Sequence, residues 1–231
     1  MTTDANDQSQ RVAARVAGLA YLISVAIVVT GEFAIRARLM VPGNIAETAR
    51  AILANERLFR LYIACDLTYC VGMVVLLSAL YTILKPVGQN LAFLAACCRL
   101  VYALTWVAIS LNLFSALRLL KGPEYLQAFG PGRLQAMTRL YLSGYDTYYV
   151  GLLFYGLAAT FVGYLFFKSR YIPRSLAAFG VIASAWCTVC TFILFIFPNF
   201  PDVVNLWWFD SPMAIFEIAL SLWLLFKGLK I

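Results

Sequence analysis

Most of this chain consists of long apolar stretches that contain no Asp, Glu, Lys or Arg. One of them runs from Ser175 to Phe197. A helix of about 20 apolar residues crosses the hydrocarbon core of a bilayer, where backbone groups must be hydrogen-bonded within the segment. Hydrophobic residues make up 63% of the chain and charged residues 13%, against roughly 45–50% and 25% in soluble domains. We therefore expect an all-α fold, a polytopic membrane helical bundle.

The expected bundle has about six transmembrane helices and two short interfacial helices. The spans are about 15–36, 61–84, 91–117, 145–167, 175–197 and 211–226. Asn44 is placed to cap the first interfacial helix, with Glu47 three residues later. The second follows Gly130-Pro131-Gly132, and Leu134, Met137, Leu140 and Tyr141 share one of its faces. We expect residues 1–10 to form a disordered N-terminal tail and residues 11–231 a single transmembrane helical domain.

An even number of spans places both termini on the same side of the membrane. The loop at 168–174 and the C-terminal segment carry basic residues and no acid, whereas the loop at 198–210 carries Asp202 and Asp210 and no base. Basic residues favour the cytoplasmic side, so we expect a plasma (inner) membrane protein with both termini in the cytoplasm. The net charge of +7 predicts contact with the headgroups of membrane lipids. We expect no nucleic-acid partner, and the oligomeric state stays open.

The chain has no histidine, and its six cysteines lie in apolar stretches. Because His is the commonest metal ligand and acid–base residue, three-His zinc sites and His-ligated haem are excluded. Cys187 and Cys190 have the spacing of a redox or metal pair, but large apolar residues surround them, which favours small buried side chains. We expect neither a metal site nor a cofactor.

Seven charged residues lie inside or at the edges of the apolar stretches: Glu32, Arg36, Arg60, Asp66, Arg99, Asp146 and Glu217. A charge at the bilayer centre costs about 2.5–3.5 kcal/mol, so such residues usually pair or line a cavity. Counting about 1.5 Å per residue from the cytoplasmic ends places Arg99 and Glu217 near the midplane, and we expect a direct ion pair between them. The other five lie at the outer rim and are expected to converge, with Tyr145, on one outward-opening pocket.

The seven charges sum to −1 if all are ionised. One carboxyl is therefore left without a basic partner, and it is either protonated or faces a cationic ligand. Glu217 and Asp146 are the candidates for the protonated carboxyl, and they are the catalytic candidates if the protein is an enzyme. A purely structural interpretation is also open, in which ion pairs such as Glu32–Arg36 only fix helix packing.

Aromatic side chains lie at the same depths as these charges. Arg99, Tyr102 and Trp106 share one helix face at spacings of three and four residues. This pattern fits bundle packing and an interfacial belt, or a wall for a flat lipophilic ligand. The candidate binding residues are Glu32, Arg36, Arg60, Asp66, Tyr69, Arg99, Tyr102, Trp106, Tyr145, Asp146, Tyr149 and Glu217.

Short phrases surround the charged residues in a defined order. They include Gly31-Glu32 with Arg36, Phe59-Arg60 before Asp66-Leu67, Arg99-Leu100-Val101, Gly144-Tyr145-Asp146, Ile172-Pro173-Arg174 and Glu217-Ile218-Ala219-Leu220. By their order and spacing, the chain from Arg11 to Leu229 resembles the bacterial membrane family of domain of unknown function 4386. The resemblance implies a helical bundle of the bacterial inner membrane and supplies no reaction.

Three functions stay open from the residues alone. The first is binding or movement of a small amphiphilic or lipid-like ligand in a charged, aromatic-lined intramembrane cavity open to the outer side. The alternative is an intramembrane enzyme that uses carboxylates as general acid and base on a lipid-like (isoprenoid) substrate, such as a cyclase or isomerase. The third is a structural or accessory subunit. These functions differ in whether the charged residues line a cavity or form a closed network.

Overall fold

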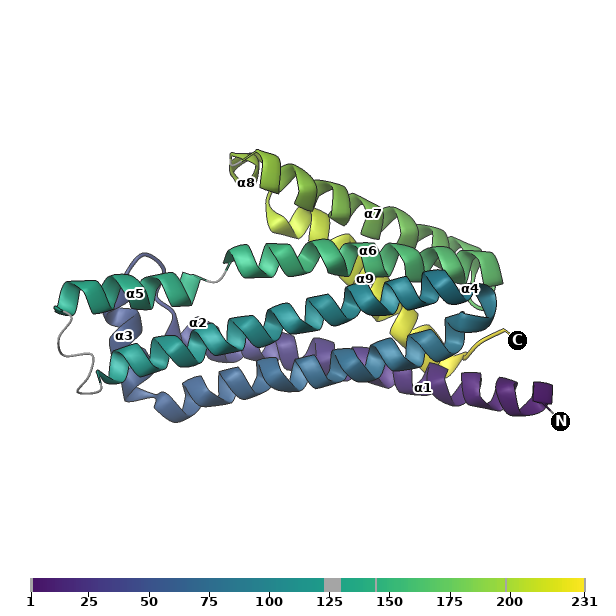
Figure 1. The fold of residues 1–231 in the computed structure, drawn as a ribbon, viewed down its shortest axis with the longest axis horizontal. Helices are drawn as coiled ribbons and strands as arrows, with labels where there is room; N and C mark the ends of the chain where they lie inside the picture. Colours follow the sequence, from purple (N-terminus) through teal and green to yellow (C-terminus); the bar gives the residue numbers. More distant parts are fainter. Residues whose placement is uncertain (1, 123–129, 144, 198, 231) are drawn as a thin grey trace. The chain divides into compact units, whose positions relative to one another are not determined.

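The computed structural model describes residues 2–122, 130–143, 145–197 and 199–230. Within these ranges the chain is helical and contains no β-strand. Figure 1 shows the helices in chain order. Their bounds are α1 Thr2–Val29, the π-helix η1 Thr30–Arg36, α2 Ala37–Leu39, α3 Ile45–Ala54, α4 Glu56–Lys121, α5 Pro131–Ser143, α6 Tyr145–Ser169, α7 Arg174–Ile196, α8 Phe200–Val203 and α9 Leu206–Phe226.

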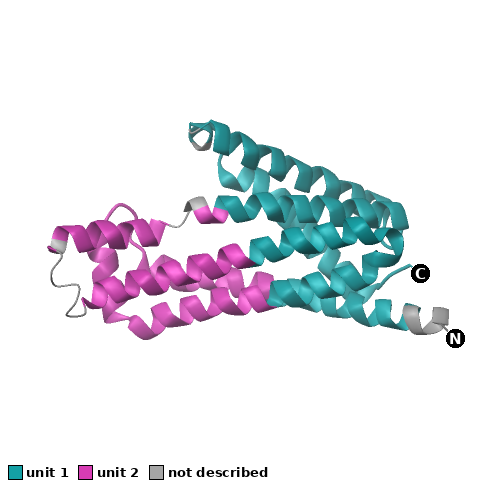
Figure 2. Cartoon of the chain, viewed as in Figure 1, with its two compact units in different colours: residues 1–23, 72–103, 149–231 teal, residues 24–71, 104–148 magenta. Residues whose placement is uncertain are grey.

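The helices form two compact units, which Figure 2 distinguishes by colour. Unit 1 comprises residues 1–23, 72–103 and 149–231, and unit 2 comprises residues 24–71 and 104–148. Helices α1, α4 and α6 contribute to both units, so neither unit is continuous along the chain. The structure divides the expected domain of residues 11–231 between two compact units, and its being a single domain stays a prediction.

Five helical stretches are long and apolar enough to cross a membrane. They are 7–39, 56–121, 132–169, 174–196 and 206–226. This arrangement is compatible with a multi-pass membrane protein. Two of the spans expected from the sequence, 61–84 and 91–117, fall within the one helix α4.

Helix α4 has 66 residues and would be about 100 Å long if it were straight. Its backbone leaves the helical conformation at Gly88, where φ is −175° and ψ is 89°. Pro86, two residues earlier, lacks the N–H group that a continuous helix requires. The ribbon turns back on itself at this point (Figure 1), so a break between the expected spans 61–84 and 91–117 is confirmed.

Unit 1 contains helices that approach one another closely at small residues. Helices α7 and α9 pack together, and Phe216 of α9 is fully buried. A Cβ atom added at Gly180 would collide with the Phe216 ring, and one added at Gly18 would lie 2.8 Å from the backbone oxygen of Ser221. Small residues are enriched where membrane helices pack, so these glycines allow α7 and α1 to contact α9.

The N-terminal helix, the turn of α4 and the loop before α7 meet at one end of unit 1. The side-chain amide of Gln10 donates to the carbonyl oxygen of Ile83 at 2.9 Å and lies 3.5 Å from the hydroxyl of Tyr171. The backbone N–H of Lys230 donates to the carbonyl oxygen of Tyr171 at 3.0 Å. These bonds also hold the C-terminal segment at this end.

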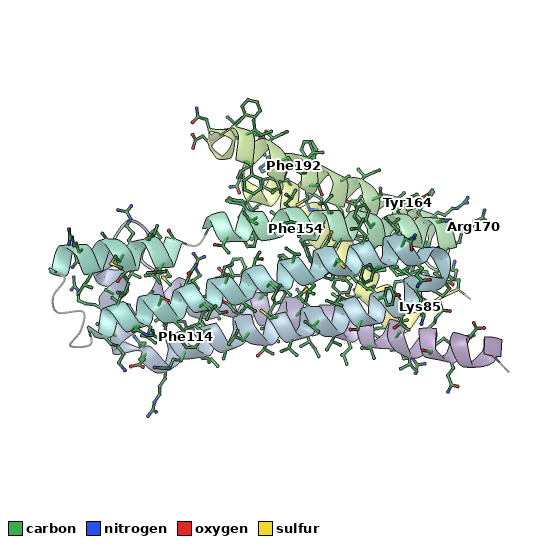
Figure 3. The ribbon with its side chains drawn as sticks, viewed as in Figure 1. Lys85, Phe114, Phe154, Tyr164, Arg170 and Phe192 are labelled. Atoms are coloured by element: carbon green, nitrogen blue, oxygen red, sulfur yellow. The ribbon has the colours of Figure 1, made fainter. Side chains whose placement is uncertain are left out.

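The same end of unit 1 carries basic side chains. Figure 3 shows the labelled Lys85 and Arg170 there. The sequence predicts a disordered tail over residues 1–10, whereas α1 begins at Thr2 and Gln10 is buried. The difference has a physical reason, because the amide of Gln10 finds a hydrogen-bond partner within the unit.

Unit 2 contains the short helix α3, and Asn44 is the N-cap residue of this helix. The side chain of Asn44 accepts a hydrogen bond from the backbone N–H of Glu47 at 3.1 Å, as the sequence predicts. Helix α3 packs against α2 and α5. The core of the unit is formed by Ile35, Leu39, Ile52, Phe59, Tyr62, Ile63, Leu113 and Leu117. Both segments expected to form short helices, at α3 and α5, are helical.

The first helix changes its hydrogen-bonding pattern near the end of the expected span 15–36. Residues Thr30–Arg36 form the π-helix η1, in which hydrogen bonds join residues five apart. The apolar pattern of this stretch does not predict the change. π-Helical turns are rare and occur frequently at functional sites, and η1 contains Glu32 and Arg36.

Candidate functional site

Arg99 of α4 and Glu217 of α9 form an ion pair inside unit 1. The Nη2 atom of Arg99 lies 3.6 Å from Oε1 of Glu217, and the two residues are 1% and 4% exposed. The ion pair expected from their matched depth is therefore confirmed. Because an unpaired buried charge is strongly destabilising, each residue constrains the helix that carries the other.

Tyrosine side chains complete this cluster. The hydroxyl of Tyr155 donates to Oε2 of Glu217, and Nη2 of Arg99 donates to the hydroxyl oxygen of Tyr21 at 3.2 Å. The guanidinium carbon of Arg99 lies 4.8 Å from the ring centroid of Tyr155 and 5.5 Å from that of Tyr21, which is within the range of cation–π contacts. Tyr102 packs on Tyr155, with ring centroids 4.3 Å apart. The cluster thus joins α1, α4, α6 and α9.

A small cavity lies beside Arg99. The described residues leave a volume of about 10 Å³ there, lined by Arg99 with Leu80, Ala95 and Val162 among others. This is roughly the volume that one water molecule requires. Oε2 of Glu217 accepts from Tyr155, and Oε1, which has no hydrogen-bond donor among the described residues, faces Arg99 at 3.6 Å. Both oxygens of this carboxylate therefore lie next to a partner within the cluster.

A second charged cluster lies in unit 2 and begins on the π-helix. The Nη1 atom of Arg36 lies 2.9 Å from Oε2 of Glu32, and the hydroxyl of Tyr62 donates to Oε1 of Glu32 at 2.7 Å. A Cβ atom added at Gly31 would lie 3.6 Å from Tyr62 and from Cys65, so η1 and α4 are in contact here. The side chains of Arg36 and Glu32 are 29% and 28% exposed, and the pair therefore reaches the surface of unit 2.

Asp66 is the buried member of this second cluster. It is 3% exposed, and its Oδ2 atom has no hydrogen-bond donor among the described residues. It interacts electrostatically with Glu32, Arg36 and Tyr62. Leaving a buried acceptor unsatisfied costs about 1–3 kcal/mol and more for a charged group, so such an atom requires a specific explanation. Glu32, Arg36 and Asp66 together carry a formal charge of −1 when ionised.

Arg60 does not belong to this cluster, so its expected convergence with Glu32 and Asp66 is wrong. The Nε atom of Arg60 lies 2.8 Å from Oε1 of Glu56, and the Arg60 side chain is 51% exposed. Lys121, at the other end of α4, lies 3.2 Å from Oε2 of Glu56. The physical reason is local, because Glu56 is four residues away on the same helix face and the long Arg60 side chain reaches solvent.

The aromatic candidates are divided between the units. In unit 2 the ring centroids of Tyr69 and Trp106 are 4.9 Å apart, and those of Trp106 and Tyr148 are 6.1 Å apart. Tyr102 belongs to unit 1, where it packs on Tyr155. The boundary between the units in α6 lies between residues 148 and 149, so Tyr149 belongs to unit 1 and the candidates before it belong to unit 2.

The remaining candidates lie at the start of α6. The side chains of Tyr145 and Asp146 are outside the part of the chain that the structure describes. Tyr149, one helical turn later, is half-buried. The convergence of Asp146 with Glu32 and Asp66 therefore stays a prediction.

Several partners of the candidate residues are not themselves candidates from the sequence. They are Tyr21, Met73 and Tyr155 in unit 1, and Glu56 and Tyr62 in unit 2. The depth count that selects Glu217 also applies to Tyr21, which lies ten residues after Arg11. Glu56 and Tyr62 each lie four residues before a charged candidate, so helical spacing supplies a signal for both.

Comparison with known proteins identifies one family. The profile of the family described as Domain of unknown function (DUF4386) matches residues 16–228, which include both charged clusters. A curated relative from Archaeoglobus fulgidus, described as "Uncharacterized protein", is 26% identical over 153 residues, or 66% of this chain and 75% of the relative. No solved structure matches the chain. The chain belongs to the family described as Domain of unknown function (DUF4386).

Proposed function

We propose that this protein binds or moves a small amphiphilic or lipid-like ligand inside the membrane, at the charged cluster of unit 2. In this proposal the polar part of the ligand contacts Glu32, Arg36 and Asp66. Its apolar part lies along neighbouring aromatic side chains. Ionisable residues within membrane spans generally mark substrate or ion pathways, because hydrocarbon makes them costly to keep.

The observation that carries the proposal is the unsatisfied oxygen of Asp66. The neighbouring Glu32 is engaged through both oxygens, by Arg36 at 2.9 Å and by Tyr62 at 2.7 Å. Oδ2 of Asp66 is buried and has no donor within the described residues. A purely structural network leaves this atom unexplained, whereas a ligand with a donor group supplies the partner it lacks.

The surroundings of Asp66 suit an amphiphile. Tyr69 lies three residues after Asp66 on α4, which is on the same helix face. Its ring packs against Trp106, with centroids 4.9 Å apart. This places an aromatic surface next to the carboxyl group. The partly exposed Glu32 and Arg36 support an opening from the surface of unit 2 towards Asp66.

The proposed topology has six crossings, with α3 and α5 lying at the interface. Helix α4 supplies two of the crossings, since a 66-residue helix interrupted at Gly88 is far longer than the roughly 20 residues of one crossing. The hydrogen bonds of Gln10 with Ile83 and Tyr171 support a common side for the N-terminus and these turns. Basic residues there favour the cytoplasm of a cell whose plasma (inner) membrane holds the protein, with the Glu32 cluster open to the outer side.

The enzyme alternative requires a carboxyl group that faces its substrate. Glu217 instead accepts from Tyr155 and pairs with Arg99. The cavity that Arg99 lines has a volume of about 10 Å³ and does not include Glu217, and this volume is far below the roughly 300–1,000 Å³ of ligand pockets. The described part of the Glu217 cluster therefore favours a structural role, and ligand binding at Asp66 is the better-supported function.

Calorimetric titration of single-chain amphiphiles tests the proposal. Octylamine, octanol and octanoate are titrated into the protein in phosphatidylcholine nanodiscs, with empty nanodiscs as the blank. At least one probe is expected to bind saturably at one site. The double variant Tyr69→Ala/Trp106→Ala is expected to weaken the binding of every probe that binds the wild type. The reason is that all three probes share the apolar chain that is proposed to lie along these rings. Trp208→Ala, which removes an exposed Trp of unit 1, is the control. Lack of saturable binding by all three probes rejects the proposal.

The proposed topology has its own test. Alkaline phosphatase, which is active only outside the cytoplasm, is fused after Gly43 or after Lys230. We expect activity for the fusion at Gly43 and none for the fusion at Lys230. The reverse pattern contradicts the cytoplasmic placement of the termini, and equal activity contradicts the odd number of crossings between the two positions.

A further inference from the structure

We infer that the polar part of the ligand is a protonated amine, whose N–H group donates a hydrogen bond to Oδ2 of Asp66. The inference rests on the proposed binding function and adds the chemical class of the ligand. It combines two independent observations, which are the charge balance of the cluster and the missing donor at one buried oxygen.

The charge balance of the cluster favours a cationic ligand. Arg36 and Glu32 pair at 2.9 Å, and the other oxygen of Glu32 is satisfied by the neutral hydroxyl of Tyr62. Arg36 also acts electrostatically on Asp66, but a single guanidinium faces two carboxylates. The described charged residues of this cluster therefore leave one negative charge uncompensated. In a low-dielectric environment such a charge is either neutralised by a proton or balanced by a partner of opposite sign, and a cationic ligand supplies that partner.

The missing hydrogen bond requires a donor. A carboxylate only accepts hydrogen bonds, and Oδ2 of Asp66 has no donor in the described part of the chain. An alcohol supplies a donor but no charge, and a quaternary ammonium supplies charge but no N–H group. A phosphate or carboxylate headgroup adds a charge of the wrong sign. A protonated amine meets both requirements through one charge-assisted hydrogen bond.

The burial of the three residues sets the orientation of the ligand. Asp66 is buried, whereas Glu32 and Arg36 are partly exposed, so the amine reaches Asp66 by way of the Glu32–Arg36 pair. Tyr69, on the same face of α4 as Asp66, then lies beside the alkyl chain. This orientation explains why the acceptor lacking a partner is the deepest carboxyl of the cluster and not Glu32.

A panel of probes with one alkyl chain and different headgroups isolates the amine. Octylamine, octyltrimethylammonium, octanol and octanoate are each titrated calorimetrically at neutral pH into the wild-type protein in nanodiscs. An alkylamine resembles the Lys side chain, whose pKa is about 10.4, and is therefore protonated under these conditions. We expect octylamine to bind at least about tenfold more tightly than each of the other three probes.

Two matched variants assign the preference to Asp66. Asp66→Asn keeps the shape of the side chain but removes its charge. It is expected to weaken the binding of octylamine at least about tenfold and to leave the affinity for octanol unchanged. Asp202→Asn changes an exposed acid on α8 and is expected to leave octylamine binding unchanged. Size-exclusion chromatography verifies that each variant is folded.

The outcomes separate this inference from the proposed function. Binding of octanol or octyltrimethylammonium as tight as that of octylamine overturns the inference and leaves the proposed function standing. Unchanged octylamine affinity in Asp66→Asn does the same. Absence of saturable binding by every probe overturns both. If Asp66→Asn does not fold, the order of headgroups on the wild-type protein decides, because that measurement needs no variant.

Discussion

The guanidinium of Arg99 lies 3.6 Å from the carboxylate of Glu217 and covers the ring of Tyr155, whose hydroxyl donates to that same carboxylate. Each member of this triangle therefore contacts the other two. A change to one of them alters the surroundings of both partners, so the energetic effects of substitutions here are expected to be coupled rather than additive.

Glu217→Gln is expected to lower the free energy of unfolding by about 3–5 kcal/mol, because it leaves the buried Arg99 without a counter-charge. Arg99→Met is expected to lower the free energy of unfolding by a similar amount, because it leaves the buried Glu217 without a counter-charge. The double variant is expected to lose at least about 1 kcal/mol less than the sum of the single losses. Denaturant unfolding in detergent, followed by circular dichroism, measures all three. Glu47→Gln, at an exposed position of α3, is the control, and strictly additive losses contradict the pairing.

Tyr155→Phe is expected to lower the free energy of unfolding by about 1.5–3 kcal/mol, because a hydrogen bond to a charged group is lost. The ring stays in place in Tyr155→Phe, so its contacts with Arg99 and Tyr102 are kept. Tyr155→Leu removes the ring as well and is therefore expected to lower the free energy of unfolding further. Thermal unfolding of the purified variants gives the order. Tyr164→Phe, at an exposed position of the same helix (Figure 3), is the matched control. An equal effect at both positions argues against the Tyr155–Glu217 bond.

Gly18→Ala is expected to destabilise the protein by about 1–3 kcal/mol through overpacking. The new methyl group would lie 2.7 Å from Cγ of Leu225 and 2.8 Å from the backbone oxygen of Ser221. The backbone oxygen cannot move aside as a side chain can. Gly132→Ala, on α5, meets no atom within 4 Å and is expected to be neutral or stabilising by up to about 1 kcal/mol. Chemical denaturation compares the two, and equal stability of both variants rules out close packing of α1 on α9.

Glu56→Gln is expected to leave thermal unfolding nearly unchanged, although Glu56 contacts both Arg60 and Lys121. Exposed ion pairs contribute little, and salt screens what they contribute. Any small effect is therefore expected to vanish at about 1 M NaCl, where the screening length is about 3 Å. The loss in Glu217→Gln is expected to persist at that salt concentration. A salt-resistant loss in Glu56→Gln contradicts the exposed character of this contact.

Several helix limits follow from local chemistry that the sequence displays. Asn44 caps α3, and Gly122, with φ of 55° and ψ of 54°, ends α4 in the left-handed conformation that glycine tolerates. The expected span 175–197 differs by one residue at each end from α7, Arg174–Ile196. These features depend on residues adjacent in sequence, which is why pattern alone locates them.

Other limits depend on which of two local signals is stronger. The sequence suggests a Trp-rich loop before a span starting at Ser211, whereas α9 begins at Leu206. The side chain of Asn205 accepts from the backbone N–H of Trp207 at 3.1 Å, and this cap starts the helix earlier than the apolar run does. Hydropathy marks the part of a helix that lies in hydrocarbon, whereas capping marks where the helix begins.

The site is only partly predictable for a different reason. Depth along a helix pairs Arg99 with Glu217, because two charges at one level of an apolar bundle need each other. Depth does not give the rotation of each helix. It therefore does not show that Arg36 pairs with Glu32 within the cluster, whereas Arg60 pairs with Glu56 outside it. The tyrosines of both clusters are equally hard to select, since depth does not tell which side of its helix a tyrosine occupies.

The π-helix also has a consequence for how the first helix tolerates changes in length. Its bonds close on the fifth residue instead of the fourth, so the segment Thr30–Arg36 holds surplus chain for the distance it covers. One residue of an α-helix corresponds to a rotation of about 100°. Losing a residue within η1 lets it become α-helical while the helices on either side keep their facing sides, whereas the same loss inside α1 rotates every later side chain. The π-helix therefore lets the chain lose one residue without rotating the helices on either side. Single-residue deletions along this part of the chain would show this tolerance, whereas substitutions, which keep the length of the chain, would not.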